Sequence, residues 1–396
     1  MFTFSLKKKN ARKKFINGFV YIRTPTVAES IPFKANKFKN KPFNQENLKK
    51  IYTKFNTFRF VKQLKYPEIL FEKDTTKVYV YLEKTKANSF DGFVGFSNNT
   101  VKKITLNGYL DLNLINTLNS GEHLKLIWKS DGNQQKTFNV AFEIPYIFKS
   151  PLGIKAQLNF FKQDSLFQNT KTTIDLGYMI NHNARIYFGY QSTESSDIQN
   201  SNSITISDFQ NSFVTSDFEF IDYIDESLFF LEKTKINLKL GIGSRSTFQN
   251  KNNQIFINGD FKHDIYLSEK NSFNIKSQNY FLKSETYLNN ELYRFGGINS
   301  IRGFNENSLQ GNVFTGLFAE YRYVASPNLY FYSITDFGYY QDKANNTEDQ
   351  LYGLGFGFGL LSNGGLFNLV YANGNTGNQT IKLSNSIVQI SFKTYF

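Results

Sequence analysis

The sequence predicts a membrane all-β protein: an antiparallel transmembrane β-barrel of about sixteen strands, preceded by one small α+β domain. Three observations predict this fold. From about residue 90 onward, short segments alternate apolar and polar residues, as strands with two different faces do. Short and long polar breaks separate these segments, as turns and loops do in membrane barrels. Phe (43) and Tyr (24) are abundant, and they suit strands and the aromatic girdles of a barrel.

The composition excludes several classes of function. The chain of 396 residues contains no cysteine, which excludes a disulfide framework, a thiol nucleophile and a cysteine-ligated metal. The net charge of +13 would suggest nucleic acid, but the Lys and Arg residues are spread along the chain among Asp and Glu. We therefore expect no nucleic-acid partner. No stretch approaches the roughly 20 apolar residues of a transmembrane helix.

The first 88 residues differ from the rest. We interpret residues 1–15 as a solvated basic tail that need not be ordered. No apolar signal-peptide core follows it, so the sequence leaves open whether a signal peptide lies upstream of Met1. Residues 16–88 predict a small α+β domain. Its helix carries Leu48, Ile51 and Phe55 at helical spacing, and strand-like runs cover residues 19–22, 61–71 and 77–83.

Residues 89–396 predict the barrel. Ile174, Leu176 and Tyr178, for example, alternate with Asp175 and Gly177. A soluble β-sandwich also alternates, but its strands recur every 8–12 residues. Here about sixteen segments recur roughly every 19 residues, which fits the longer strands and unequal loops of a membrane barrel. The pattern favours the barrel over the sandwich.

The most specific motif is FGGINSIRGF, residues 295–304. It resembles the GG…(V/I)RG(F/Y) motif of the BamA/TamA superfamily of outer-membrane assembly proteins, which also includes the two-partner-secretion transporters. In that family the motif lies on a loop folded into the barrel lumen between strands eleven and twelve, and our count of segments places it there, on residues 285–311. The resemblance implies a lumen latch at the matching positions, which are Gly296, Gly297, Ile301, Arg302, Gly303 and Phe304.

The resemblance extends to acidic partners of the latch. In the family the loop arginine meets an acidic residue on strand twelve and an aspartate on strand thirteen. Glu320 and Asp336 match these positions, and alternation turns both toward the lumen. A guanidinium offers planar, bidentate donors to carboxylates, so the pairing is chemically sound. An ordinary loop arginine would not require two matching acids.

The resemblance implies further features of the chain. Residues 16–88 are similar to a periplasmic POTRA domain, and the final strand resembles a C-terminal β-signal with Phe392, Tyr395 and Phe396. The implied function is assembly or translocation of client proteins in the bacterial outer membrane, through lateral opening between the first and last strands. The expected gate residues are Asp91, Gly92, Gly95, Ile390 and Phe392. The implied partners are outer-membrane lipids, unfolded outer-membrane proteins and, as an open point, periplasmic or lipoprotein accessory subunits.

Two other functions stay open: a protein-export pore of the two-partner-secretion kind, and a surface barrel without transport activity. We expect no enzyme and no cofactor. The three histidines, at positions 123, 182 and 263, have no metal-ligand spacing, so no metal site is predicted. Client identity and the presence of further upstream POTRA domains cannot be read from the sequence.

Overall fold

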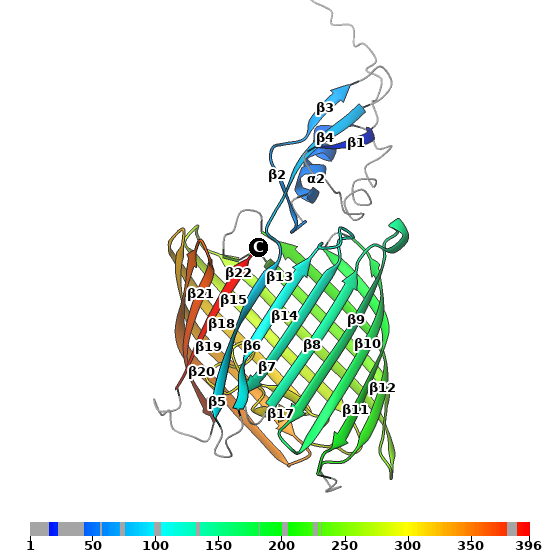
Figure 1. Ribbon diagram of the computed structural model, residues 1–396, viewed down its shortest axis with the longest axis vertical. Helices are drawn as coiled ribbons and strands as arrows, with labels where there is room; N and C mark the ends of the chain where they lie inside the picture. Colours follow the sequence, from blue (N-terminus) through cyan, green and yellow to red (C-terminus); the bar gives the residue numbers. More distant parts are fainter. Residues whose placement is uncertain are drawn as a thin grey trace, which may run out of the picture.

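The computed structural model describes residues 16–22, 43–55, 58–71, 76–98, 104–131, 135–181, 183–199, 205–224, 229–230, 232–377 and 386–396. The predicted basic tail, residues 1–15, lies outside the described residues. The chain forms a small α+β unit followed by a large barrel (Figure 1). Within the described ranges, no helix is both long enough and apolar enough to cross a bilayer.

The small unit packs one helix against a four-stranded sheet. Its elements are β1 (Ile16–Ile22), α2 (Gln45–Phe55), β2 (Val61–Gln63), β3 (Glu68–Phe71) and β4 (Thr76–Lys84). β4 pairs in parallel with β1 and antiparallel with β2 and β3. Asn44 caps α2, because its side-chain oxygen accepts a 2.6 Å hydrogen bond from the backbone N–H of Asn47. The apolar stripe of the helix, with Ile51 fully buried, packs against Val78 and Val80. That this unit is a POTRA domain stays a prediction.

The rest of the chain forms one closed barrel of sixteen antiparallel strands (Figure 1), so the barrel prediction is confirmed and the sandwich alternative is wrong. The wall strands are β5 (Ser89–Asn98), β6 (Ile104–Ile115), β7 (His123–Asp131), β8 (Gln135–Ile144), β9 (Leu152–Gln163), β10 (Phe167–Met179), β11 (Ala184–Asp197), β12 (Phe209–Tyr223), β13 (Glu232–Ser246), β14 (Lys251–Tyr266), β15 (Asn271–Lys283), β18 (Val313–Ser326), β19 (Leu329–Asp342), β20 (Thr347–Ser362), β21 (Gly365–Thr376) and β22 (Ser386–Tyr395). A short 3₁₀ turn, η1 (Ile147–Lys149), joins β8 to β9.

Neighbours in the wall are neighbours in the chain, and the barrel closes where β22 meets β5. Because the number of strands is even, β5 begins and β22 finishes at the same end. We call this the near end, and the α+β unit lies beside it (Figure 1). The opposite end is the far end. It carries the long connection between β15 and β18, which holds two short paired strands, β16 (Tyr293–Phe295) and β17 (Leu309–Gly311).

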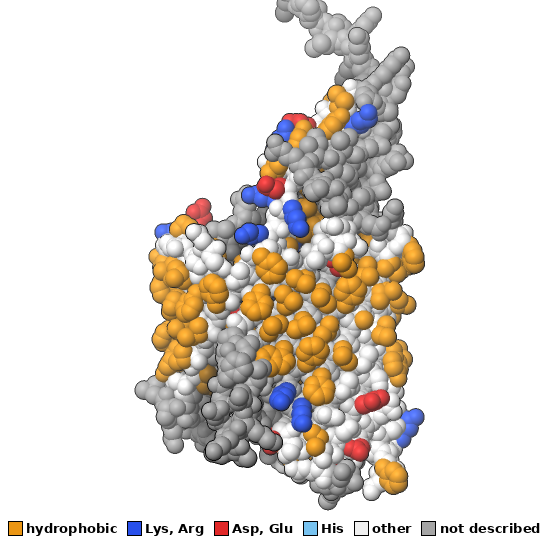
Figure 2. All heavy atoms as spheres, in the orientation of Figure 1, with side chains coloured by type: hydrophobic (Ala, Val, Ile, Leu, Met, Phe, Trp, Pro, Cys, Tyr) orange, Lys and Arg blue, Asp and Glu red, His pale blue; other side chains and the backbone are white. Residues whose placement is uncertain are grey.

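The two faces of the wall differ as the alternation predicts. On β10, Ile174 and Leu176 point outward and are 58% and 62% exposed, while Thr173 and Asp175 point inward and are buried. Figure 2 shows outward apolar side chains as a broad band across the face of the barrel in view. An apolar band of this kind is the surface that a transmembrane barrel presents to lipid.

One interface of the closed wall has far fewer register pairs than the others. The seam between β22 and β5 has three register pairs, Lys393 with Asp91, Thr394 with Phe90, and Tyr395 with Ser89. Every other interface of the described wall has between eight and fourteen. The pairs of the seam lie at the near end, so residues 92–98 and 386–392 have no register partner across it.

Candidate functional site: a loop anchored inside the barrel

The connection between β15 and β18, residues 284–312, folds back into the lumen. Several of its apolar side chains are buried against the inner face of the wall: Ile301 is completely buried, and Phe295 is 2% exposed. The ring of Phe295 stacks on that of Phe314 of β18, with ring centroids 4.0 Å apart. Phe318 and Leu351 complete this apolar cluster. Packing against wall side chains therefore fixes the middle of the loop inside the barrel.

Arg302 stands at the centre of the loop's polar contacts. Its backbone N–H and its Nε donate to Asp336 Oδ2 on β19, at 2.9 and 2.8 Å. Its Nη2 contacts the other oxygen of the same carboxylate, and its Nη1 contacts Glu320 Oε1 on β18. The structure thus brings together Arg302, Glu320 and Asp336, the three charged residues of the predicted latch.

The arginine belongs to a longer chain of buried charges. Glu320 Oε2 also accepts from Arg322 Nε at 2.8 Å, and Arg322 Nη1 reaches Asp264 Oδ1 at 3.2 Å. Two guanidinium groups and three carboxylates therefore alternate across β14, β18, β19 and the loop. Buried charges that are paired and hydrogen-bonded in this way avoid the penalty of an isolated charge. Removing one member leaves its neighbours uncompensated.

The electrostatics keep Arg302 protonated. Burial alone would lower the pKa of its guanidinium. The hydrogen bonds and charge of Asp336, together with the charge of Glu320, outweigh burial and raise the pKa of Arg302 above its ordinary value. The arginine therefore acts as a permanent cation in the lumen. Its ion pairs require the carboxylates of Asp336 and Glu320 to be ionised.

Glycine at position 303 lets the loop touch the wall. Gly303 has a φ of +87°, a backbone conformation that other residues rarely adopt. A Cβ atom on Gly303 would lie 2.1 Å from the backbone nitrogen of Gly374 on β21. The wall approaches in a similar way from β20, where a Cβ on Gly353 would lie 2.5 Å from the carbonyl oxygen of Arg302. Glycines on the loop and on the wall thus allow backbone-to-backbone contact.

Further glycines follow Gly353 along β20, at every second position toward the near end. Gly357 and Gly359 leave room for the rings of Tyr332 and Tyr330, which would lie 2.4 and 2.1 Å from an added Cβ. These glycines therefore provide packing space for aromatic side chains inside the barrel wall.

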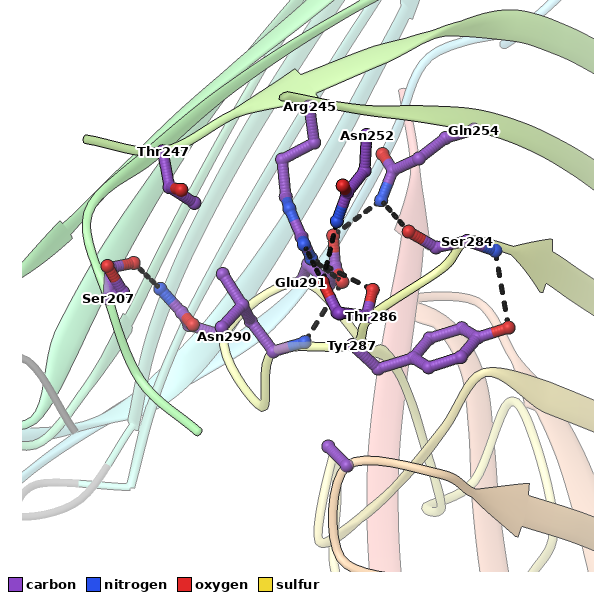
Figure 3. A network of polar contacts seen from close by, with 12 residues as sticks. Ser207, Arg245, Thr247, Asn252, Gln254, Ser284, Thr286, Tyr287, Asn290 and Glu291 are labelled. Atoms are coloured by element: carbon purple, nitrogen blue, oxygen red, sulfur yellow. Dashed lines mark hydrogen bonds and ion pairs between the residues drawn. The ribbon is translucent and has the colours of Figure 1, made fainter. Parts of the chain in front are cut away.

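A second buried ion pair anchors the loop, and the sequence did not single it out (Figure 3). Arg245 of β13 pairs with Glu291 of the loop, and their side chains are 3% and 1% exposed. Glu291 also accepts from Gln254 Nε2 and from the backbone N–H of Leu288, both at 2.9 Å. Arg245 Nη2 donates to Thr286 Oγ1 at 2.6 Å. Alternation along β13 is enough to turn Arg245 toward the lumen, but nothing in the sequence of the loop marks Glu291 as its partner.

Further contacts fasten the loop to other parts of the wall. Asn290 donates to Ser195 Oγ of β11 at 2.7 Å. It also donates to the carbonyl oxygen of Ser207 at 2.8 Å (Figure 3). Arg294 donates to Gln163 of β9 at 3.3 Å. The loop is therefore attached on several sides of the lumen, well beyond the two predicted acidic partners.

The predicted gate residues lie on the two strands of the seam, but only Asp91 is paired across it, with Lys393. Gly92, Gly95, Ile390 and Phe392 lie in the parts of β5 and β22 without a register partner across the seam. Ile390 and Phe392 point outward and are 55% and 43% exposed.

The residues of the predicted β-signal end the wall. Tyr395 pairs with Ser89 across the seam, and the backbone N–H of Phe396 donates to the carbonyl oxygen of Asn88 at 3.1 Å. The side chains of Phe392 and Phe396 are both exposed. The last residues of the chain therefore supply the pairing that closes the barrel at the near end, and their signalling role stays a prediction.

We compared the chain with protein families, curated proteins and solved structures, and only the solved structures gave matches. No protein-family model matches the chain, and no curated protein matches its sequence. Among solved structures, a BamA from Haemophilus ducreyi lacking POTRA domains 1–3 matches with a TM-score of 0.57 and 12% identity, over 98% of this chain and 86% of that one. CdiB from Acinetobacter baumannii matches with a TM-score of 0.65 and 14% identity, over 97% and 74%. CdiB from Escherichia coli matches with a TM-score of 0.63 and 11% identity, over 97% and 77%.

The chain has the fold of BamA and CdiB. The resemblance to the BamA/TamA superfamily is thereby supported at the level of the fold. In the part of the chain that the structure describes, no group of three or more His, Asp or Glu side chains could hold a metal ion.

Proposed function

We propose that this protein is an outer-membrane assembly factor that inserts or translocates client proteins by lateral opening between β5 and β22. The observation that carries the proposal is the seam, with three register pairs where the other interfaces have eight or more. The BamA/CdiB fold and the outward apolar band support a location in the outer membrane. On this account the α+β unit at the near end lies in the periplasm as a POTRA domain.

The energetics of the seam suggest the step that recruits a client. Residues 92–98 of β5 and 386–392 of β22 present backbone N–H and C=O groups with no register partner across the seam. In lipid an unsatisfied backbone group costs several kcal/mol. A client segment of about seven residues in β conformation would satisfy these groups by strand addition. Unfolded outer-membrane proteins, whose alternating segments are strands without partners, are the clients that fit.

A disulfide across the seam tests the proposal, since the chain has no cysteine of its own. Phe90→Cys and Thr394→Cys place thiols on register partners of β5 and β22. Lateral opening requires the oxidised variant to lose client insertion into liposomes and to regain it on reduction. The matched control is Val214→Cys with Ile242→Cys, outward-facing register partners on β12 and β13, and it should insert clients in both states. Full activity with the seam oxidised would contradict lateral opening.

The second candidate function is a protein-export pore of the two-partner-secretion kind. It is favoured by the CdiB matches, whose TM-scores of 0.65 and 0.63 exceed the 0.57 of the BamA match. A pore passes its client through the lumen, so it would work with the seam oxidised but would need the loop to leave its anchors. The same cross-linked protein therefore separates the two functions.

A further inference from the structure

The tip of the lumen loop crosses the seam on its inner side. On the flank of the seam formed by β22 and the strands before it, Arg302 is hydrogen-bonded to β19, and Gly303 lies against the backbone of Gly374 on β21. Three residues further along the chain, Glu306 Oε1 lies 2.6 Å from Lys129 Nζ on β7. Within residues 303–306 the loop thus passes from one flank of the seam to the other.

A longer hydrogen bond accompanies the ion pair of Lys129 and Glu306 on the other flank of the seam, formed by β5 and the strands after it. Gln135 Nε2 of β8 donates to the carbonyl oxygen of Asn307 at 3.4 Å. β7 and β8 follow β5 in the wall, and β19 and β21 precede β22. The loop therefore contacts strands on both sides of the place where the wall is least paired.

The crossing occurs at the height where pairing of the seam is missing. Lys129 is the register partner of Tyr109 on β6, which is the partner of Phe93 on β5. On the other flank Asn373, the neighbour of Gly374, is the partner of Ser386 on β22. Phe93 and Ser386 both lie in the stretches without register partners across the seam. The loop spans the part of the seam that lies beyond the three backbone pairs of the near end.

Gly297 of the motif leaves space for the Glu306 side chain that contacts Lys129. It has a φ of +97°, and a Cβ atom there would lie 2.1 Å from Glu306 Oε2. Any side chain at position 297 would strain the backbone and displace the carboxylate that reaches Lys129. The second glycine of the motif thus makes room for the acidic group that contacts the opposite flank.

We propose that Lys129 and Glu306 form an ion-pair strap that holds the β5–β22 seam closed from the lumen side, and that this strap releases when the seam opens. The purpose assigned to the strap rests on the proposed function, whereas its effect on the seam can be measured without clients. The two side chains are 28% and 35% exposed, unlike the buried pair of Arg302 and Asp336. Water can replace the contact, so the strap can open reversibly while Arg302 stays anchored.

Spin-label distances across the seam test the strap in the full chain reconstituted in lipid. Labels at Ser97→Cys on β5 and Val388→Cys on β22 report the width of the unpaired stretch. Glu306→Gln should raise the ratio of wide to narrow distances by about two- to fivefold, the range expected when a partly exposed ion pair is lost. Lys129→Glu should act in the same way. The exchanged pair Lys129→Glu with Glu306→Lys should return the ratio toward that of the unaltered protein.

The control is Glu232→Gln, which removes a comparable ion pair with Lys262 on the neighbouring strands β13 and β14, away from the seam. It should leave the distances unchanged. Equal distances in Glu306→Gln and the unaltered protein would overturn the strap, and so would failure of the exchanged pair to restore them. Client insertion is assayed separately. If the substitutions change the spin-label distances as expected but the protein does not insert clients, the proposed function is overturned and the strap is supported.

Discussion

At the scale of single residues, the lumen is organised by charges that have partners. Arg302, Glu320 and Asp336 are 6%, 11% and 0% exposed in their side chains. Alternation along β18 and β19 was enough to turn the two acids inward, and the motif was enough to select the arginine. Glu291 could not be found in this way, because a loop has no period that tells which side chains are buried. Alternation thus predicted which side chains of the wall face the lumen, but it could not predict that Glu291 of the loop is buried.

Arg302→Ala should release the loop from the wall. The substitution leaves Asp336 and Glu320 buried without their cation, which typically costs about 3–5 kcal/mol. We expect faster proteolysis within residues 296–306 in intact protein and a lower free energy of unfolding in urea. Arg294→Ala is the matched control, since this arginine of the same loop contacts the ring of Phe161 and the amide of Gln163. Equal sensitivity of the two variants would show that the carboxylate partners do not hold the loop.

At the scale of elements, alternation predicted the strands of the wall well, because each wall strand has one face toward the apolar outside and one toward the lumen. The eleventh and twelfth predicted segments correspond to β15 and β18. The hairpin of β16 and β17 was not predicted, since strands of three residues are too short to show a period. The sequence placed the seam between the first and last strands, but the number of its register pairs could not be predicted, because pairing depends on register and not on composition.

Gly359→Ala should destabilise the barrel from within β20. The new Cβ would lie 2.1 Å from the ring of Tyr330, and overpacking of this kind typically costs about 1–3 kcal/mol. Gly259→Ala on β14 is the control, because its Cβ would meet only Leu238 Cδ1, at an ordinary 3.7 Å. Thermal unfolding in detergent should show a lower midpoint for Gly359→Ala alone. An unchanged midpoint would mean that the tyrosine moves aside without cost.

At the scale of the whole molecule, the loop acts as an internal brace for a wall that is closed by few backbone bonds. It contacts β7, β9, β11, β13, β19 and β21, so it connects strands that are far apart around the barrel. Under the proposed function the wall opens at one seam, and the rest of the wall then has to stay together. The distribution of these contacts is consistent with that need, and it also means that an export pore would have to displace the loop.

Amide hydrogen exchange of the full protein in lipid bilayers tests the central claim most directly, that the β5–β22 seam is the weakest interface of the wall. Exchange should be fastest, among the amides of the wall strands, in residues 92–98 and 386–392, because these stretches have no register partners across the seam. The strands β12 and β13, joined by fourteen register pairs, should exchange much more slowly. Protection of β5 and β22 equal to that of β12 and β13 would contradict the account.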